Sequence, residues 1–153
     1  MKNYPALDVG NIAVGQVLAE RAILVSFTGI VASSIAARDF HPLHHDRDFA
    51  RHQGHPTIFP SSLISGAMAQ RFVTDWAGPL ARVISMNTRL GVPQYAEDTL
   101  VLKGQVTAVP SESSNCIEVT VIGTNSRGQH LQSVIRLDPE TQGSGTARST
   151  RGP

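Results

Sequence analysis

The stretch SSLISGAMAQRFVTDW, residues 61–76, decides the fold that we expect from this chain. It contains no proline, and small or apolar residues occur on nearly every side of the helix that it would form. That distribution is typical of a buried helix rather than a surface helix. We therefore predict a buried helix that begins at Ser61 or Ser62 and ends near residue 76, before Gly78 and Pro79.

Four segments with strand character follow this helix. Each alternates apolar and polar side chains with a period of two, and they cover residues 82–90, 99–109, 117–122 and 130–137. The links between the last three are rich in turn-forming residues and close to hairpin length. The pattern predicts an antiparallel meander in the second half of the chain. Together with the helix it predicts an α+β fold, in which one antiparallel sheet wraps around a long central helix.

The segment before the helix carries weaker signals. We expect a short strand at residues 14–18 and a second strand at residues 22–28, joined by a hairpin. Thr28 suits the N-cap of a following helical turn, because its hydroxyl can accept a hydrogen bond from a free backbone N–H. Asp46 suits the N-cap of a brief helix that continues through Ala50.

Length and composition fit a single domain in a reducing compartment. The 153 residues suffice for one core, which we place at residues 1–138, and the Gly-, Ser- and Thr-rich residues 139–153 predict a flexible tail. Cys116 is the only cysteine and no charged-then-apolar leader opens the chain, so we expect a cytoplasmic protein. Lysine and arginine (13) nearly balance aspartate and glutamate (12), and no apolar run has the length of a membrane helix. We therefore expect neither a nucleic-acid partner nor a membrane span.

The stretch DFHPLHHD, residues 39–46, concentrates two carboxylates and three imidazoles in eight residues. Its proline fixes its own φ and disfavours helix at the preceding residue, so we expect Asp39 and His44 on a rigid turn. A carboxylate and an imidazole held in this way can orient a water molecule and take its proton. The histidines and Asp46 are also possible metal ligands, but adjacent histidines in an extended segment point to opposite sides, so we predict no metal.

These residues carry a resemblance to a known family. The chain resembles the MaoC-like (R)-specific enoyl-CoA hydratases, whose signature runs Ser-Gly-Asp-x-Asn-Pro-aliphatic-His, followed after five residues by a small one. Residues 37–44 read Ala-Arg-Asp-Phe-His-Pro-Leu-His, and Ala50 follows. The Asp, Pro, aliphatic, His and small positions match, whereas the Ser, Gly and Asn positions do not. The resemblance covers about residues 14–137 and implies a hot-dog fold.

The resemblance also implies an activity and a site. Members of the family add water across a trans-2-enoyl-CoA thioester, and their site assignment makes Asp39 the base and His44 its partner. In the family a glycine at the start of the long helix donates its N–H to the thioester oxygen. Here Ser61 or Ser62 stands at that place, directly after Pro60. An N–H is still available there, and a helix N-terminus favours developing negative charge.

Several other residues have two interpretations. His41 stands where the family has asparagine, and it is either a member of the substrate site or a residue with a structural hydrogen bond. Arg71, Arg89 and Lys103 either hold the phosphates of coenzyme A or are solvated surface charges. The segment 74–79, with its tryptophan, is expected to pack or to form an interface.

A narrower likeness concerns the partner. The chain is similar to the small subunit of actinobacterial two-subunit hydratases that act on steroid side-chain enoyl-CoA thioesters. The likeness lies in residues 38–39, 44–46, 58–59 and 74–79. In those enzymes this subunit supplies the catalytic pair. The likeness implies a heteromer with a second MaoC-like subunit, with a homodimer as the alternative. It implies no cofactor apart from the coenzyme A of the substrate.

Two further classes of function stay open. A hot-dog acyl-CoA thioesterase would act on similar thioesters, but such enzymes usually carry an acid on the long helix, and residues 61–74 contain no Asp or Glu. A non-catalytic subunit that only completes a partner's acyl-CoA pocket would be suggested by a degenerate Asp39 or His44, and both residues are present. The hydratase interpretation therefore leads.

Overall fold

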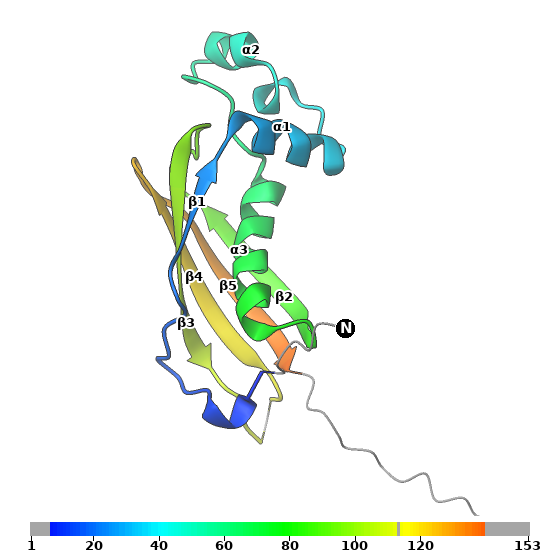
Figure 1. Cartoon of the computed structure of the whole chain (residues 1–153), viewed down its shortest axis with the longest axis vertical. Coiled ribbons are helices and arrows are strands. Elements are labelled where there is room, and N and C mark those ends of the chain that lie inside the picture. Colours follow the sequence, from blue (N-terminus) through cyan, green and yellow to red (C-terminus); the bar gives the residue numbers. More distant parts are fainter. Residues whose placement is uncertain (1–6, 113, 140–153) are drawn as a thin grey trace, which may run out of the picture.

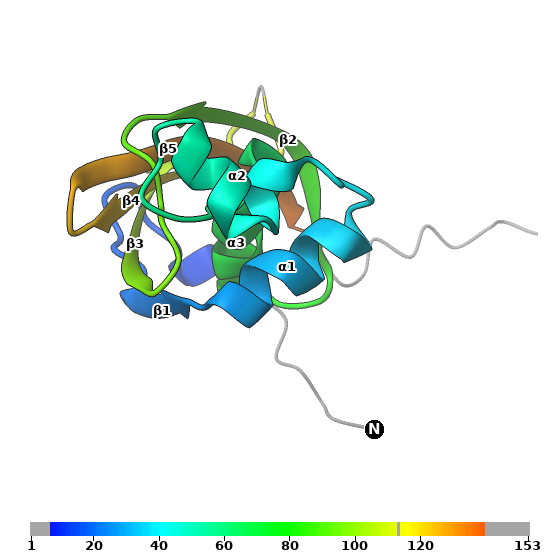
Figure 2. The same cartoon turned by 90° about the horizontal axis from the view of Figure 1, so that it is seen from above.

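The computed structural model describes residues 7–112 and 114–139, and it consists of one antiparallel sheet curved around one long helix (Figures 1 and 2). The helix, α3 (Ser62–Ala77), lies along the concave face of the sheet, as the sequence predicted. The strands are β1 (Arg21–Val25), β2 (Ala81–Leu90), β3 (Asp98–Ala108), β4 (Ile117–Asn125) and β5 (Gly128–Pro139). Two shorter helices, α1 (Phe27–Ala36) and α2 (Arg47–His52), lie beyond the N-terminal end of α3. The expected flexible tail, residues 139–153, lies outside the described residues apart from Pro139.

The core forms between the concave face of the sheet and one side of α3. Neighbouring residues on a strand point to opposite faces, and about every second residue of β3, β4 and β5 is buried. The helix adds Ala69, Phe72 and Val73 from its sheet side. The apolar strand residues with no exposed surface are Leu100, Leu102, Ile117, Val119, Val121, Leu131, Ile135 and Leu137. Each such side chain stabilises the fold by about 1.5–3 kcal/mol, so this layer fixes the position of α3.

The side of α3 that faces away from the sheet is exposed. Leu63, Ala67, Arg71 and Asp75 follow one another at intervals of four residues, and all four are exposed. Leu63 is apolar and yet 62% exposed. The expectation of a helix buried on every side is therefore wrong for the single chain, because one sheet covers only one side of a helix.

The strand order is β1-β3-β4-β5-β2, and this order corrects the predicted meander. Only β3, β4 and β5 follow one another through hairpins. Strand β2 pairs with β5, for example Met86 with Ile135, and not with β3. The connection after β2 therefore crosses to the far side of the sheet, and β1 and β2 form its two free edges. A bulge between Val83 and Ser85 bends the β2 edge.

The N-terminal part differs from the prediction in two ways. Residues 14–18 form an isolated bridge from Val17 to Gln105 and a few backbone hydrogen bonds to β3, but no strand. Strand β1 pairs with β3 instead of making a hairpin with this segment. Helix α1 starts earlier than expected, because the hydroxyl of Ser26 and not that of Thr28 caps it. The prediction for Asp46 is confirmed, as this residue is the N-cap of α2. Among the described residues, no helix combines the length and the apolar character that crossing a membrane requires.

Candidate active site

A tight helix end presents Asp39. At the C-terminus of α1, the N–H of Arg38 donates to the carbonyl of Ile35 at 3.1 Å, and the N–H of Asp39 donates to that of Ser34 at 2.9 Å. This pair of bonds is the Schellman pattern, which needs a left-handed residue at its turning point. Arg38 takes that role with φ of 55°. The signature of the resembling family has glycine at this position, and the left-handed backbone explains why. The chain therefore reverses sharply and directs the Asp39 carboxylate back toward α3.

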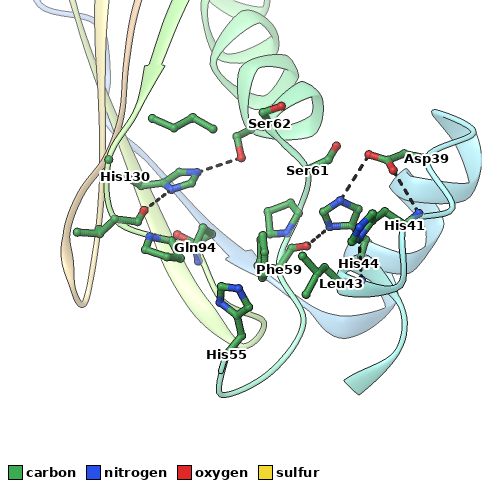
Figure 3. Close-up of a pocket in the computed structure, with 16 residues that line it drawn as sticks. Asp39, His41, Leu43, His44, His55, Phe59, Ser61, Ser62, Gln94 and His130 are labelled. Carbon is green, nitrogen blue, oxygen red and sulfur yellow. Dashed lines mark hydrogen bonds and ion pairs between the residues drawn. The ribbon is translucent and has the colours of Figure 1, made fainter. Parts of the chain in front are cut away.

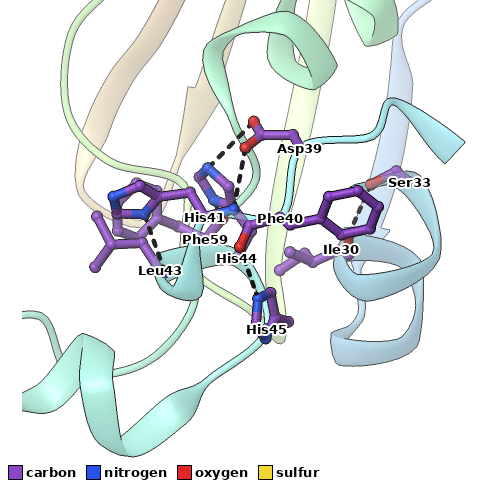
Figure 4. A network of polar contacts seen from close by, with 9 residues as sticks. All are labelled: Ile30, Ser33, Asp39, Phe40, His41, Leu43, His44, His45 and Phe59. Carbon is purple, nitrogen blue, oxygen red and sulfur yellow. Dashed lines mark hydrogen bonds and ion pairs between the residues drawn. The ribbon is translucent and has the colours of Figure 1, made fainter. Parts of the chain in front are cut away.

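A short 3₁₀ turn, η2 (Pro42–His44), presents His44. The ring of His44 is buried, and its Nδ1 lies 2.7 Å from the carbonyl oxygen of Phe59. A carbonyl can only accept, so Nδ1 carries the proton and donates it, which leaves Nε2 as an acceptor in the neutral ring. Nε2 lies 3.5 Å from Oδ2 of Asp39 (Figure 4). The gap is too long for a strong direct hydrogen bond, and both facing atoms can accept hydrogen bonds from a water molecule.

His41 organises this turn. Its Nδ1 accepts a hydrogen bond from the N–H of Leu43 at 3.3 Å, which caps η2, and its own N–H donates to Oδ1 of Asp39 at 3.3 Å. Of its two predicted roles, the structural one is therefore present, and the ring also lines the cavity described next. His45 points away from His44, is exposed, and donates from Nε2 to the Phe40 carbonyl.

A cavity of about 530 Å³ opens beside the N-terminus of α3 (Figure 3). Its size falls in the range of small-molecule sites. The structure brings all six predicted site residues into its lining: Asp39, His41, His44, Pro60, Ser61 and Ser62. The other lining residues are Leu43, His55, Phe59, Ser65, Leu90, Gly91, Val92, Pro93, Gln94 and His130. Within residues 7–112 and 114–139, no group of three His, Cys, Asp or Glu side chains is placed to hold a metal ion.

The first turn of α3 offers free donors to this cavity. Ser61 is the N-cap, but its side chain makes no capping hydrogen bond. Its Oγ is buried and has no hydrogen-bond partner in the described part of the chain. The first N–H groups of a helix have no partner within the helix, and the helix dipole adds partial positive charge there. The arrangement suits an oxygen atom that becomes negative during a reaction.

The opposite wall of the cavity contains residues that the sequence interpretation missed. His130 is buried, its Nδ1 donates to the Val92 carbonyl at 2.7 Å, and its Nε2 accepts from the Ser65 hydroxyl at 3.0 Å. Burial lowers the pKa of His130 from its usual value of 6.5, because the interior disfavours the charged ring. His55 bonds the hydroxyl of Tyr95 at 3.1 Å. None of these positions lies in a motif, and the only signal in the sequence was that His130 belongs to an alternating segment, which became β5.

The three basic residues considered for coenzyme A phosphates are spread over the molecule. Lys103 pairs with Glu20 at 3.0 Å, and Arg71 lies 3.6 Å from Asp75 on the exposed side of α3. Neither lines the cavity. Arg89 directly precedes Leu90, which does line it, so Arg89 is the one of the three nearest to the cavity along the chain.

Comparison with known proteins shows the family to which the chain belongs. The profile of the FAS1-like dehydratase domain region matches residues 12–134. The chain is 45% identical to the 3-oxo-4,17-pregnadiene-20-carboxyl-CoA hydratase beta subunit of Mycobacterium tuberculosis (strain ATCC 25618 / H37Rv). That alignment spans 124 residues, or 81% of this chain and 94% of the relative.

Solved structures agree with this assignment. A chain of the ChsH1-ChsH2 complex from Mycobacterium tuberculosis superposes with a TM-score of 0.79 at 44% identity, covering 83% of this chain and 98% of that one. The R-hydratase PhaJ1 from Pseudomonas aeruginosa gives a TM-score of 0.79 at 18% identity over 88% of this chain and 86% of its own, which shows a shared fold. The chain therefore belongs to the FAS1-like dehydratase domains, a MaoC-like family with the hot-dog fold.

Proposed function

We propose that this chain is an enoyl-CoA hydratase, which adds water across the double bond of a trans-2-enoyl-CoA thioester through Asp39 and His44. One observation carries the proposal: Nε2 of His44 and Oδ2 of Asp39 face each other across 3.5 Å at the wall of a ligand-sized cavity. The Phe59 carbonyl accepts a hydrogen bond from Nδ1 of His44, which keeps the ring proton on the nitrogen that does not face Asp39. A water molecule between the two acceptors is therefore oriented with its lone pairs toward the cavity.

The pair can carry out both proton transfers of hydration. The water oxygen bonds to Cβ of the substrate while Asp39 takes a proton from that water and Nε2 of His44 accepts a hydrogen bond from its second hydrogen. A proton then passes from the pair to Cα, so the water is consumed and the pair returns to its starting state. Such acid–base assistance contributes roughly a hundredfold or more to a rate. The reaction needs no cofactor besides the coenzyme A that the substrate carries.

The N-terminus of α3 is proposed to stabilise the intermediate. During the addition, negative charge moves from Cα to the thioester oxygen and forms an enolate. The backbone N–H groups of Ser61 and Ser62, together with the unpartnered Oγ of Ser61, are donors for that oxygen. Pro60 has no N–H of its own and sets the chain direction into this turn. His41 limits the cavity on the side of the catalytic turn.

The relatives support a proposal for the substrate class and for the assembly. The 45% identical protein is named as a hydratase of a pregnadiene carboxyl-CoA, so we propose a steroid side-chain enoyl-CoA thioester as the substrate. The complex of two different chains that contains the 44% identical structure leads us to propose a heteromer with a second subunit of the same fold. Exposed apolar side chains support a partner: Leu24, Ile35, Phe40, Leu63, Ile84, Met86 and Leu90. They lie on the two free edge strands and around α1 and α3, where the strand or helix of a partner could cover them.

Substitutions in the pair test the catalytic proposal. Asp39→Asn and His44→Ala should each lower kcat about a hundredfold or more, because each removes one of the two groups that handle the proton. The matched control is His45→Ala, which changes an exposed neighbour outside the cavity and should stay close to the original rate. Hydration is followed by the loss of absorbance of the conjugated thioester, and circular dichroism verifies the fold. Activity that survives both substitutions, or that disappears on metal chelation, would contradict the proposal.

Light scattering and activity of the purified chain, with and without the second subunit, test the assembly. We expect the mixed complex to be active on steroid side-chain enoyl thioesters and the chain alone to be less active, since its exposed apolar surface is then uncovered. A fully active monomer would refute the requirement for a partner. An active homodimer would keep the pairing but reject the second type of subunit.

A further inference from the structure

A second pair of polar side chains lies across the cavity from Asp39 and His44. Ser65 and His130 are 1% and 4% exposed, and the Ser65 hydroxyl lies 3.0 Å from Nε2 of His130. Because Nδ1 of His130 donates to the Val92 carbonyl at 2.7 Å, Nε2 of the neutral ring must accept, and the serine must donate. Figure 3 shows His130 on one side of Ser61 and Asp39 on the other.

This arrangement has the parts of an activated nucleophile. A hydroxyl is bonded to a base, and a third group, here the Val92 carbonyl, fixes the orientation and tautomer of that base. Both side chains line the cavity. The burial of His130 lowers its pKa, so the ring stays neutral and able to accept a proton at neutral pH.

We propose that Ser65 and His130 form a second catalytic centre, which cleaves acyl thioesters by transferring the acyl group to the Ser65 hydroxyl. The substrate class is an acyl-CoA, the class that the neighbouring pair is proposed to hydrate. The serine centre would act on the carbonyl carbon and needs no double bond. It therefore goes beyond the proposed hydration and does not depend on it.

The first turn of α3 supplies the required oxyanion donors. Ser61 and Ser65 are four residues apart and lie on the same side of the helix, and the N–H of Ser65 donates to the Ser61 carbonyl at 3.0 Å. The buried Oγ of Ser61, which has no partner in the described residues, is thus one helical turn from the nucleophile. A hydroxyl donor and free helix N–H groups can stabilise the negative oxygen of a tetrahedral intermediate.

The proposed reaction has two halves. In the first, the Ser65 oxygen bonds to the thioester carbon, its proton moves to Nε2 of His130, the carbon–sulfur bond breaks, and the leaving thiolate takes that proton. In the second, His130 takes a proton from a water molecule, whose oxygen attacks the acyl-serine carbon. The bond to Ser65 then breaks, the serine recovers the proton, and a carboxylic acid leaves. Water is the only co-reactant.

A saturated acyl-CoA, such as octanoyl-CoA, separates the two activities, because it has no double bond to hydrate. The full-length protein, in the assembly in which it purifies, is incubated with this thioester, and free thiol is measured with a disulfide reagent. We expect thiol release that falls at least about a hundredfold in Ser65→Ala and in His130→Asn. The matched control is Ser133→Ala, which removes another buried hydroxyl, bonded to Thr88 at 2.8 Å outside the cavity lining, and should leave the release unchanged.

Covalent labelling gives a second readout. A fluorophosphonate probe should modify the protein once, with the mass located on the peptide that contains Ser65, and His130→Asn should abolish the modification. If Ser65→Ala fails to fold, Ser65→Cys takes its place and should be alkylated faster than the same variant combined with His130→Asn. The proposal is overturned by absence of both thiol release and labelling, by a label on another residue, or by release that persists in Ser65→Ala. Failure here would leave hydration through Asp39 and His44 untouched.

Discussion

Replacing Arg38 by glycine should stabilise the protein, although it removes a large side chain. Arg38 occupies the left-handed turning point of the Schellman motif with φ of 55°, a conformation that costs an L-residue about 1–2 kcal/mol and costs glycine nothing. Glycine also loses more conformational freedom on folding, which costs about 0.5–1 kcal/mol. The difference leaves a net gain of about 0.5–1 kcal/mol in the free energy of unfolding. For a chain of this length that gain raises Tm by about 2 °C.

The informative comparison is Arg38→Gly with Arg38→Ala. Both remove the guanidinium, which is exposed and makes no hydrogen bond or ion pair within the described residues, so the two variants differ only in how they tolerate the backbone conformation. Urea unfolding of both variants measures the difference. A control with the opposite expected sign is Arg51→Gly, at an exposed position inside α2. This substitution should lower the free energy of unfolding by about 1 kcal/mol. If Arg38→Gly proved less stable than Arg38→Ala, the left-handed backbone at this position would not be the cost that we assign to it.

Two further predictions concern stability. Gly123→Ala should lower the free energy of unfolding by about 1–3 kcal/mol, because an added Cβ would lie 2.8 Å from Cγ of Leu131 in the core. The control is Gly10→Ala, whose added Cβ would meet only ordinary contacts. It should change the free energy of unfolding by less than about 0.5 kcal/mol in the same urea titration. The pKa of His130 is lower in the folded protein than its ordinary value of 6.5, so below about pH 6.5 the unfolded chain binds a proton that the folded chain does not. The contribution of His130 to the free energy of unfolding is therefore fully present above that pH and decreases below it. Tm measured from pH 7.5 to 5.5 should therefore fall less steeply in His130→Asn than in the unchanged protein, and equal slopes would contradict the burial argument.

Local patterns in the sequence were enough to locate most elements of the fold. The period-two alternation located β3, β4 and β5 within a few residues, and the proline-free run located α3 almost to its bounds. The pairing of β2 with β5 was not visible, because alternation tells which face of a strand is buried but not which strand lies beside it. The exposed side of α3 was hidden for a similar reason. Leu63 and Ala67 are as apolar as the buried residues, and only the placement of the sheet distinguishes them.

The candidate site was also predictable only in part. That Asp39 and His44 lie close together could be predicted, because both belong to one short turn whose proline and spacing are visible in the sequence. His130 and Ser65 meet across 65 positions, and a histidine at the start of a strand gives no signal of a partner on a helix. The αL backbone at Arg38 was also missed, since nothing in an arginine indicates left-handed φ. What remained unpredicted was therefore the set of contacts between residues far apart in the chain.

The strand order also has a consequence for biosynthesis. Arg21 of β1 pairs with Leu102 of β3, about 80 positions further along the chain, and β2 pairs within the described residues only with β5, the last strand that the structure describes. The turn that holds Asp39 and His44 and the start of α3 both lie inside the loop that the pairing of β1 with β3 closes. A nascent chain that has left the ribosome up to β3 thus holds both Asp39 and His44, yet it lacks β5, the strand against which α3 packs most. We therefore expect the candidate site to reach its final geometry only after β5 has been made and has paired with β2.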